Sequence, residues 1–302
     1  MTRPPSSIAA PFAVACVGIA LFSLMDAVVK DIVLVIGAYN AMIWRQMVAT
    51  ALGSSIFLGT RSAWPGPAVI RIAAKRGVLG AVMAFAFFWG IARVPLAEGI
   101  ALSFIAPLIA LYLAAVLLGE QVGKRAVAAS ALGFFGVIVI FLGRMGEATH
   151  DRAAWLGIGS ILISAVLYAY NLILQRQQAQ ITTPSQVVLL QNGFAFAATL
   201  PFFPWFGVAP PADLWPMIVL AACITVASLF LLSWAYARAE TQLLLPVEYT
   251  AFLWAALFGW LFFREQVTLP IVAGAVLIVT GCIIAARAKP QVQREPVESA
   301  MV

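Results

Sequence analysis

The chain alternates long apolar runs with short segments that hold most of its charged residues and prolines. Each run stays apolar for about 20 residues, without the alternation of a half-buried strand. Such runs are long enough to cross a bilayer core as helices. They predict membrane spans at 8–29, 38–59, 77–93, 96–118, 125–143, 154–175, 186–206, 214–236, 241–263 and 268–287. We therefore expect an all-α, polytopic membrane protein with ten transmembrane helices.

The amino-acid composition is typical of a protein embedded in a lipid bilayer. Of its residues 63% are hydrophobic and 10% charged, and the mean hydropathy is +1.00, whereas soluble domains carry about 25% charged residues. The net charge of +6 would suggest a nucleic-acid partner in a soluble protein. Here all Lys and Arg residues except Arg45 lie outside the predicted spans or at the end of one, so we expect no nucleic acid and use these residues to predict orientation.

The distribution of Lys and Arg predicts that both termini are cytoplasmic. With that orientation, twelve Lys and Arg residues lie in inside segments and five in outside segments, while Arg45 falls within a span. Basic residues favour the cytoplasmic side of a membrane. The first apolar run is too long for a cleaved signal peptide, so we expect a retained anchor in a bacterial inner membrane.

An internal repeat is the strongest organisational feature of the sequence. A shift of 145 residues superposes two Glu-Gln-Val segments, 120–122 on 265–267, and Trp89 on Trp234. The same shift superposes 92–93 on 237–238, Gly136 on Gly281, Gln46 on Gln191, and Asp26 on Asn171. We predict a first repeat at 1–147, a second at 148–290 and a cytoplasmic tail at 291–302. Five spans per repeat, an odd number, would invert one repeat relative to the other, with a substrate site between them.

Ionisable side chains inside spans are the first candidates for that site, because each is costly to insert and needs a partner or a wet cavity. Asp26 is expected near the outer end of the first span, and Arg45 about seven residues into the second. The two could form a structural ion pair, or Asp26 could pair with Lys30. Alternatively, Arg45 or Asp26 contacts a charged group of the substrate, since a guanidinium binds carboxylate or phosphate well.

Two glutamates are further candidates. Glu248 is the deepest acid, two residues after Pro246, which frees a main-chain carbonyl within its span. It could contact substrate, carry a proton or make a structural hydrogen bond. Glu98 lies near the start of its span and is either functional or interfacial.

Aromatic and amide side chains complete the candidate substrate-binding set. Tyr168 and Asn171 form a polar patch in the sixth span, and Tyr249 follows Glu248. Trp234 could stack on a flat substrate, although its place near a span end, like that of Trp89, also suits an interface anchor.

Catalytic and metal-binding patterns are absent from the sequence. Its single histidine, His150, has no metal-ligand spacing around it, and no nucleotide or nucleophile motif stands in a fitting context. We expect neither an enzyme nor a cofactor. Glu120 and Glu265 suit helix capping, and Gly133 and Gly281 suit close helix packing.

Four segments resemble the EamA-type ten-helix transporters of the bacterial drug/metabolite transporter superfamily. They are FSLMDAVVK (22–30), IWRQ (43–46), PLAEGIALSFIAPLIALYLAAVLLGE (95–120) and LPVEYTAFLWAALFGWLFFRE (245–265). Arg264 departs from the family pattern, which usually has Gly before the Glu. The resemblance implies a central cavity between the halves, alternating access, and substrates such as amino acids or vitamins.

The sequence thus favours a secondary transporter of a small amphiphilic metabolite, such as an amino acid, an aromatic or a vitamin-like molecule. Protons are a possible coupling ion, and the chain could act as a monomer or a homodimer. A non-transporting membrane scaffold is the alternative. The chain lacks the extended soluble loops through which a scaffold usually binds its partners, which counts against this alternative.

Overall fold

The computed structural model describes residues 9–94, 96–103, 105–119, 122–144, 152–263 and 269–286, and most of these residues are helical. The helices of the first part are α1 (Ala9–Gly59), α2 (Pro67–Ile91), α3 (Leu96–Ser103), α4 (Ile105–Leu118) and α5 (Lys124–Arg144). Those of the second part are α6 (Arg152–Ile181), α7 (Pro184–Thr199), η1 (Leu200–Phe202), α8 (Phe203–Phe206), η2 (Ala212–Leu214), α9 (Trp215–Tyr236), α10 (Thr241–Glu248), α11 (Thr250–Phe263) and α12 (Leu269–Ala286). Six helical stretches in this described part have the length and hydropathy of membrane spans.

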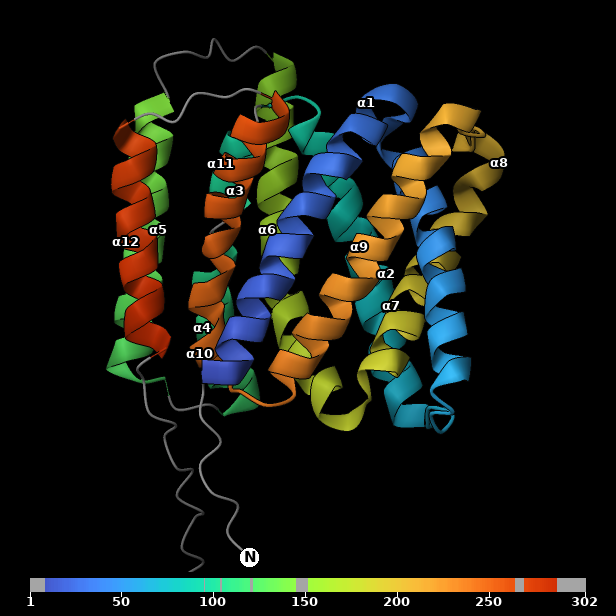
Figure 1. The fold of residues 1–302 in the computed structure, drawn as a ribbon, viewed down its shortest axis with the longest axis horizontal. Helices are drawn as coiled ribbons and strands as arrows, with labels where there is room; N and C mark the ends of the chain where they lie inside the picture. The colour runs from blue at the N-terminus through green and yellow to red at the C-terminus, as the bar shows by residue number, and fades with distance from the viewer. Residues whose placement is uncertain are drawn as a thin grey trace, which may run out of the picture.

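Helix α1 contains two apolar arms that meet at Gly37. This residue has φ 77° and ψ 160°, a conformation that favours glycine, and the chain reverses there (Figure 1). The predicted spans 8–29 and 38–59 leave a loop at 30–37. That expectation was wrong, because the first arm stays helical through Lys30. Asp26 therefore lies eleven residues before the reversal, which is about 16 Å at 1.5 Å per residue. It is deep in the bundle and not near the outer end of its span.

Helix α2 begins ten residues earlier than the apolar run that predicted it. Gly66 precedes the helix and Pro67 occupies its first turn, where a proline loses no hydrogen bond. Arg71, Lys75 and Arg76 therefore lie on the helix and not in a loop as expected. Arg76 is only 2% exposed, so it cannot count as a loop cation in the prediction of orientation.

The helices form one bundle in which the two parts of the chain interlock. α1 packs against α9 and α7, α2 against α6 and α7, and α5 against α12. Glycines permit some of these approaches, as expected: a Cβ on Gly281 would lie 2.8 Å from the Ala129 carbonyl oxygen, and one on Gly133 would lie 2.4 Å from the Tyr249 ring. α1 begins at the lower end of the bundle in Figure 1, and α6 begins at the upper end.

A stacked Trp–Arg pair follows the same pattern in both parts of the chain. The Arg93 guanidinium lies 3.4 Å from the centre of the Trp89 ring and donates a 2.6 Å hydrogen bond to the Trp89 carbonyl. The Arg238 guanidinium lies 4.1 Å from the Trp234 ring centre and donates to the Trp234 carbonyl at 3.2 Å. The pairs are 145 residues apart in sequence, so the repeat extends to side-chain conformation.

Candidate functional site

A cavity that is partly open to the outside lies inside the bundle. Helices α1, α2, α3 and α4 line it from the first part of the chain, and α6, α10 and α11 from the second. The site therefore draws on both parts of the repeat.

Three pairs of lining residues are related by the 145-residue offset. They are Ile19 with Ser164, Ser23 with Tyr168, and Ser103 with Glu248. Equivalent positions of the two parts thus face one space. The cavity lies where an internal repeat of this kind would be expected to form a shared site.

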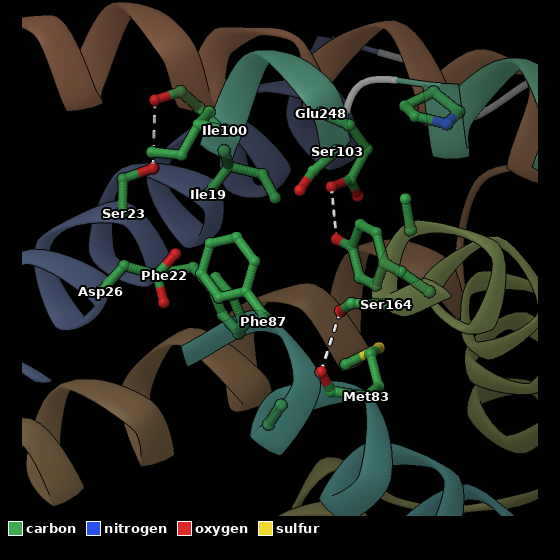
Figure 2. A pocket seen from close by; sticks show the side chains of 15 residues that line it. Ile19, Phe22, Ser23, Asp26, Met83, Phe87, Ile100, Ser103, Ser164 and Glu248 are labelled. Carbon is green, nitrogen blue, oxygen red and sulfur yellow. Dashed lines mark hydrogen bonds between the residues drawn. The ribbon is translucent and has the colours of Figure 1, made fainter. Parts of the chain in front are cut away.

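The walls of the cavity are mainly apolar and aromatic. The rings of Phe22 and Phe87 lie between the two acidic side chains in the view of Figure 2, and Ile19 and Ile100 add aliphatic surface. Ser164 donates its hydroxyl proton to the Met83 carbonyl at 2.8 Å. This bond leaves the serine oxygen as an acceptor toward the cavity.

Glu248 enters the cavity with both carboxylate oxygens hydrogen-bonded. Its Oε2 accepts from the Tyr168 hydroxyl at 2.6 Å, and its Oε1 accepts from the Tyr236 hydroxyl at 3.0 Å. The side chain is 5% exposed. The break between α10 and α11 follows directly, at Tyr249, so the carboxylate sits at the end of a short helix that contains Pro246.

Asp26 faces the same cavity from α1 but has no such partners. Its side chain is 9% exposed, and within the described residues its carboxylate has no hydrogen bond and no ion pair within 4.0 Å. Figure 2 shows it across the cavity from Glu248. Its oxygens are not among the fully buried side-chain atoms that lack a hydrogen bond, so Asp26 keeps open acceptor positions toward the cavity.

Arg45 lies behind the cavity wall. Its guanidinium interacts electrostatically with Asp26, but Nη1 donates to the Thr225 hydroxyl of α9 at 2.8 Å instead. The side chain is 6% exposed, and Arg45 is not among the described residues that line the cavity. The close ion pair considered from the sequence is therefore not formed in this conformation.

A second polar cluster, the Arg76 cluster, surrounds the buried guanidinium of α2. It consists of Arg76 and three amide side chains on one face of α6. Arg76 donates to the Oδ1 of Asn171 at 3.2 Å, the Oε1 of Gln175 at 2.5 Å and the Oε1 of Gln178 at 2.9 Å. Asn171 thus bonds to Arg76 and is not among the described lining residues.

The remaining candidates have different surroundings. Trp234 stacks under Arg238 near the end of α9 and does not line the described cavity. Tyr249 is fully buried and its ring packs against Gly133 of α5, away from the lining. Glu98 belongs to α3 by its backbone, and its side chain lies outside the described residues.

The sequence did not single out five polar residues of these networks, namely Tyr236, Arg76, Gln175, Gln178 and Thr225. Tyr236 contacts Glu248 across the turn between α9 and α10, which no local pattern marks. In the sequence, Arg76 directly precedes the apolar run that begins at residue 77, so it was interpreted as a charged residue of a loop. The Gly66-Pro67 pair is the signal that could have placed it inside a helix.

Sequence comparisons give one consistent family. The profile of the EamA-like transporter family matches this chain twice, at residues 10–142 and 155–287. The pseudopaline exporter CntI of Pseudomonas aeruginosa is 28% identical over 280 residues, which cover 89% of this chain and 93% of that protein. A riboflavin transporter of Rhizobium johnstonii is 28% identical over 229 residues, which cover 73% of this chain and 72% of that protein.

Structural comparison supports the same fold. A solved crystal structure of a protein superposes with a TM-score of 0.72 at 19% identity, covering 93% of this chain and 97% of that chain. The two profile matches, the transporter relatives and the apolar helices together describe a multi-pass membrane transporter and not an enzyme. The chain belongs to the EamA-like transporter family.

Proposed function

We propose that this protein is a secondary transporter that moves a small amphiphilic organic metabolite across the bacterial inner membrane by alternating access. The observation that carries the proposal is the cavity itself. Both repeats line it, an acid enters from each side, and aromatic rings lie between the acids. Such a site can hold one polar and one apolar part of a small molecule.

The architecture proposed for this function is ten transmembrane helices arranged as two inverted five-helix repeats, 1–147 and 148–290, followed by a tail. The opposite starting ends of α1 and α6 support inversion. So do the Trp–Arg pairs, since α2 ends at the upper end of the bundle and α9 at the lower end. Inverted repeats allow one half to rock against the other around a central site.

The proposed substrate class is an amino acid, an aromatic or a vitamin-like compound. Two relatives are named for pseudopaline and for riboflavin, both small organic molecules. The phenyl rings of the cavity suit a flat apolar body, and its carboxylates and hydroxyls suit polar substituents. We further propose Asp26 and Glu248 as carriers of a coupling proton, in a chain that acts as a monomer or homodimer.

Transport in proteoliposomes tests the proposal. Purified protein should move at least one radiolabelled amino acid, aromatic amine, vitamin or nucleoside derivative under a proton gradient or by counterflow. Glu248→Gln should lower the initial rate at least tenfold, because it removes the charge that Tyr168 and Tyr236 bind. Glu240→Gln, outside the cavity lining, is the control. A protein that moves none of these compounds under any gradient would contradict a transport function.

Reporter fusions test the proposed orientation with both termini in the cytoplasm. A fluorescent protein at either terminus should fluoresce in cells, because it folds in the cytoplasm, and alkaline phosphatase at the same places should stay inactive. The reverse pattern at both ends would refute the orientation alone, and opposite patterns at the two ends would refute the even number of spans that two inverted five-helix repeats require.

A further inference from the structure

We infer that the cavity selects organic cations, with Asp26 as the counter-ion of a protonated amine and the phenyl rings as the site for an apolar body. This inference rests on the proposed function and narrows its substrate class. It follows from three observations: the charges that line the cavity, the unequal hydrogen bonding of its two acids, and the position of the nearest cations.

The ionisable side chains of the described lining are all acidic. Two of the described lining residues, Asp26 and Glu248, are acids, and none is Lys, Arg or His. In a low-dielectric cavity, unit charges interact far more strongly than in water. An anionic ligand would meet two like charges there, and a cationic ligand would meet two opposite ones.

The two acids are not equivalent. Glu248 already accepts a hydrogen bond on each oxygen, so its charge is stabilised without a ligand. The Asp26 residue is about nine-tenths buried and lines the cavity, and its carboxylate has no hydrogen bond among the described residues. An ammonium group can donate three hydrogen bonds, and Asp26 is the side chain that lacks donors.

The protein's own buried cations do not satisfy Asp26. Arg45 acts on it only electrostatically, with Nη1 held by Thr225. Arg76 is held by three amide oxygens of α6. Both guanidinium groups lie outside the described lining, so neither one blocks the space that a ligand amine would occupy.

The apolar walls define the rest of the ligand. Phe22 and Phe87 flank the space between the acids, and aliphatic side chains close it. An amine attached to an aromatic or aliphatic body can place its charge at Asp26 and its body against these rings. The class is therefore a primary or secondary amine with one hydrophobic end and no net negative charge.

Matched ligand series test this inference by thermal shift of the purified protein in detergent, because a ligand that binds the folded state raises its apparent stability. Each series keeps one body and changes the charge: tryptamine, tryptophol and indole-3-propionate; phenethylamine, 2-phenylethanol and 3-phenylpropionate; hexylamine, hexanol and heptanoate. We expect at least one amine to bind at least tenfold more tightly than its neutral and anionic partners.

Substitution at Asp26 tests the residue. Asp26→Asn should weaken the amine about 30-fold or more, as expected for removing one member of a buried charge pair, and change affinity for the neutral partner less than threefold. Asp26→Glu keeps the charge and should keep the preference for the amine. Asp31→Asn, on the same helix but outside the lining, should behave like wild type. Unchanged binding of the alcohol shows that the Asn variant is folded.

Several results would overturn the inference. They are equal or tighter binding of the alcohol or the acid, no thermal shift with any of the three amines, or an Asp26→Asn variant that still prefers the amine.

Proteoliposome assays keep this inference separate from the proposed function. Uptake of neutral or anionic members alone would refute cation selectivity and leave transport standing, whereas amine binding without movement of any compound would refute transport and leave the binding site standing.

Discussion

Replacing Arg76 with Met should destabilise the fold, because it leaves the amides of the Arg76 cluster without their donor. The guanidinium donates three hydrogen bonds across the contact between α2 and α6. Methionine matches much of the length and volume of arginine but donates nothing. The three amide oxygens would then have to find other donors inside the bundle.

The size of the effect can be bracketed. Polar contacts between membrane helices average about 0.6 kcal/mol, so three of them set a lower value of about 2 kcal/mol. A buried acceptor that loses its donor in a soluble core costs about 1–3 kcal/mol, so three would cost about 3–9 kcal/mol if none found a new donor. Gln178 Nε2 is buried without a hydrogen bond among the described residues, and it could pair with a freed oxygen. We therefore expect a loss of about 2–3 kcal/mol.

Reversible unfolding with SDS in mixed micelles measures this loss as a change in the free energy of unfolding. Arg71→Met is the matched control, since Arg71 is an exposed position on the same helix, and it should change stability by no more than about 0.5 kcal/mol. Arg76→Lys should fall between them, because an ammonium cannot reach all three acceptors in one geometry.

An Arg76→Met variant as stable as the Arg71→Met control would refute this reasoning. It would mean that the amide cluster is equally well satisfied without the guanidinium. A variant that is destabilised but transports normally would confirm a structural role and separate the Arg76 cluster from the cavity.

The remaining predictions concern packing and the neighbours of the acids. Gly133→Ala should lose about 1–3 kcal/mol of stability, because its Cβ would overlap the Tyr249 ring, whereas Gly159→Ala meets nothing within 4 Å; equal stability of the two variants would contradict this packing. Tyr236→Phe should lower transport about tenfold by removing one of two hydrogen bonds to the cavity glutamate, and an unchanged initial rate would count against that contact. Arg45→Gln should abolish uptake in proteoliposomes while the protein remains in the membrane, and normal uptake would exclude an essential role.

The sequence predicted the helices well because lipid imposes a simple requirement on length and apolarity. The helices α5, α6, α9 and α12 agree with the predicted spans to within a few residues, apart from the polar lower end of α6. Two predicted spans are interrupted: 186–206 becomes α7, η1 and α8, and 241–263 is broken between α10 and α11 at Tyr249. The other errors lie where polar residues continue a helix. α1 stays helical beyond residue 29 and α2 begins before residue 77, since a buried or interfacial polar turn lowers hydropathy without ending the hydrogen-bond ladder.

Only part of the candidate site could be predicted. Asp26, Tyr168 and Glu248 were identified because an ionisable or phenolic group inside an apolar run is unusual, and all three line the cavity. Which charges pair could not be predicted, because the partners lie far apart in sequence. Arg45 meets Thr225, 180 residues away, and Arg76 meets Asn171, 95 residues away. Both contacts depend on how each helix is rotated about its own long axis.

The stacked Trp–Arg pairs bear on how each end of the bundle interacts with the charge of the membrane leaflet around it. The same local arrangement ends α2 at one end of the bundle and α9 at the other, so it would meet both the anionic inner leaflet and the outer one. An arginine folded onto an indole ring, and bonded to the last turn of its own helix, has its charge partly satisfied internally. Each pair would thus be indifferent to leaflet charge, and in the proposed orientation Arg93 could remain on the outer side without opposing insertion.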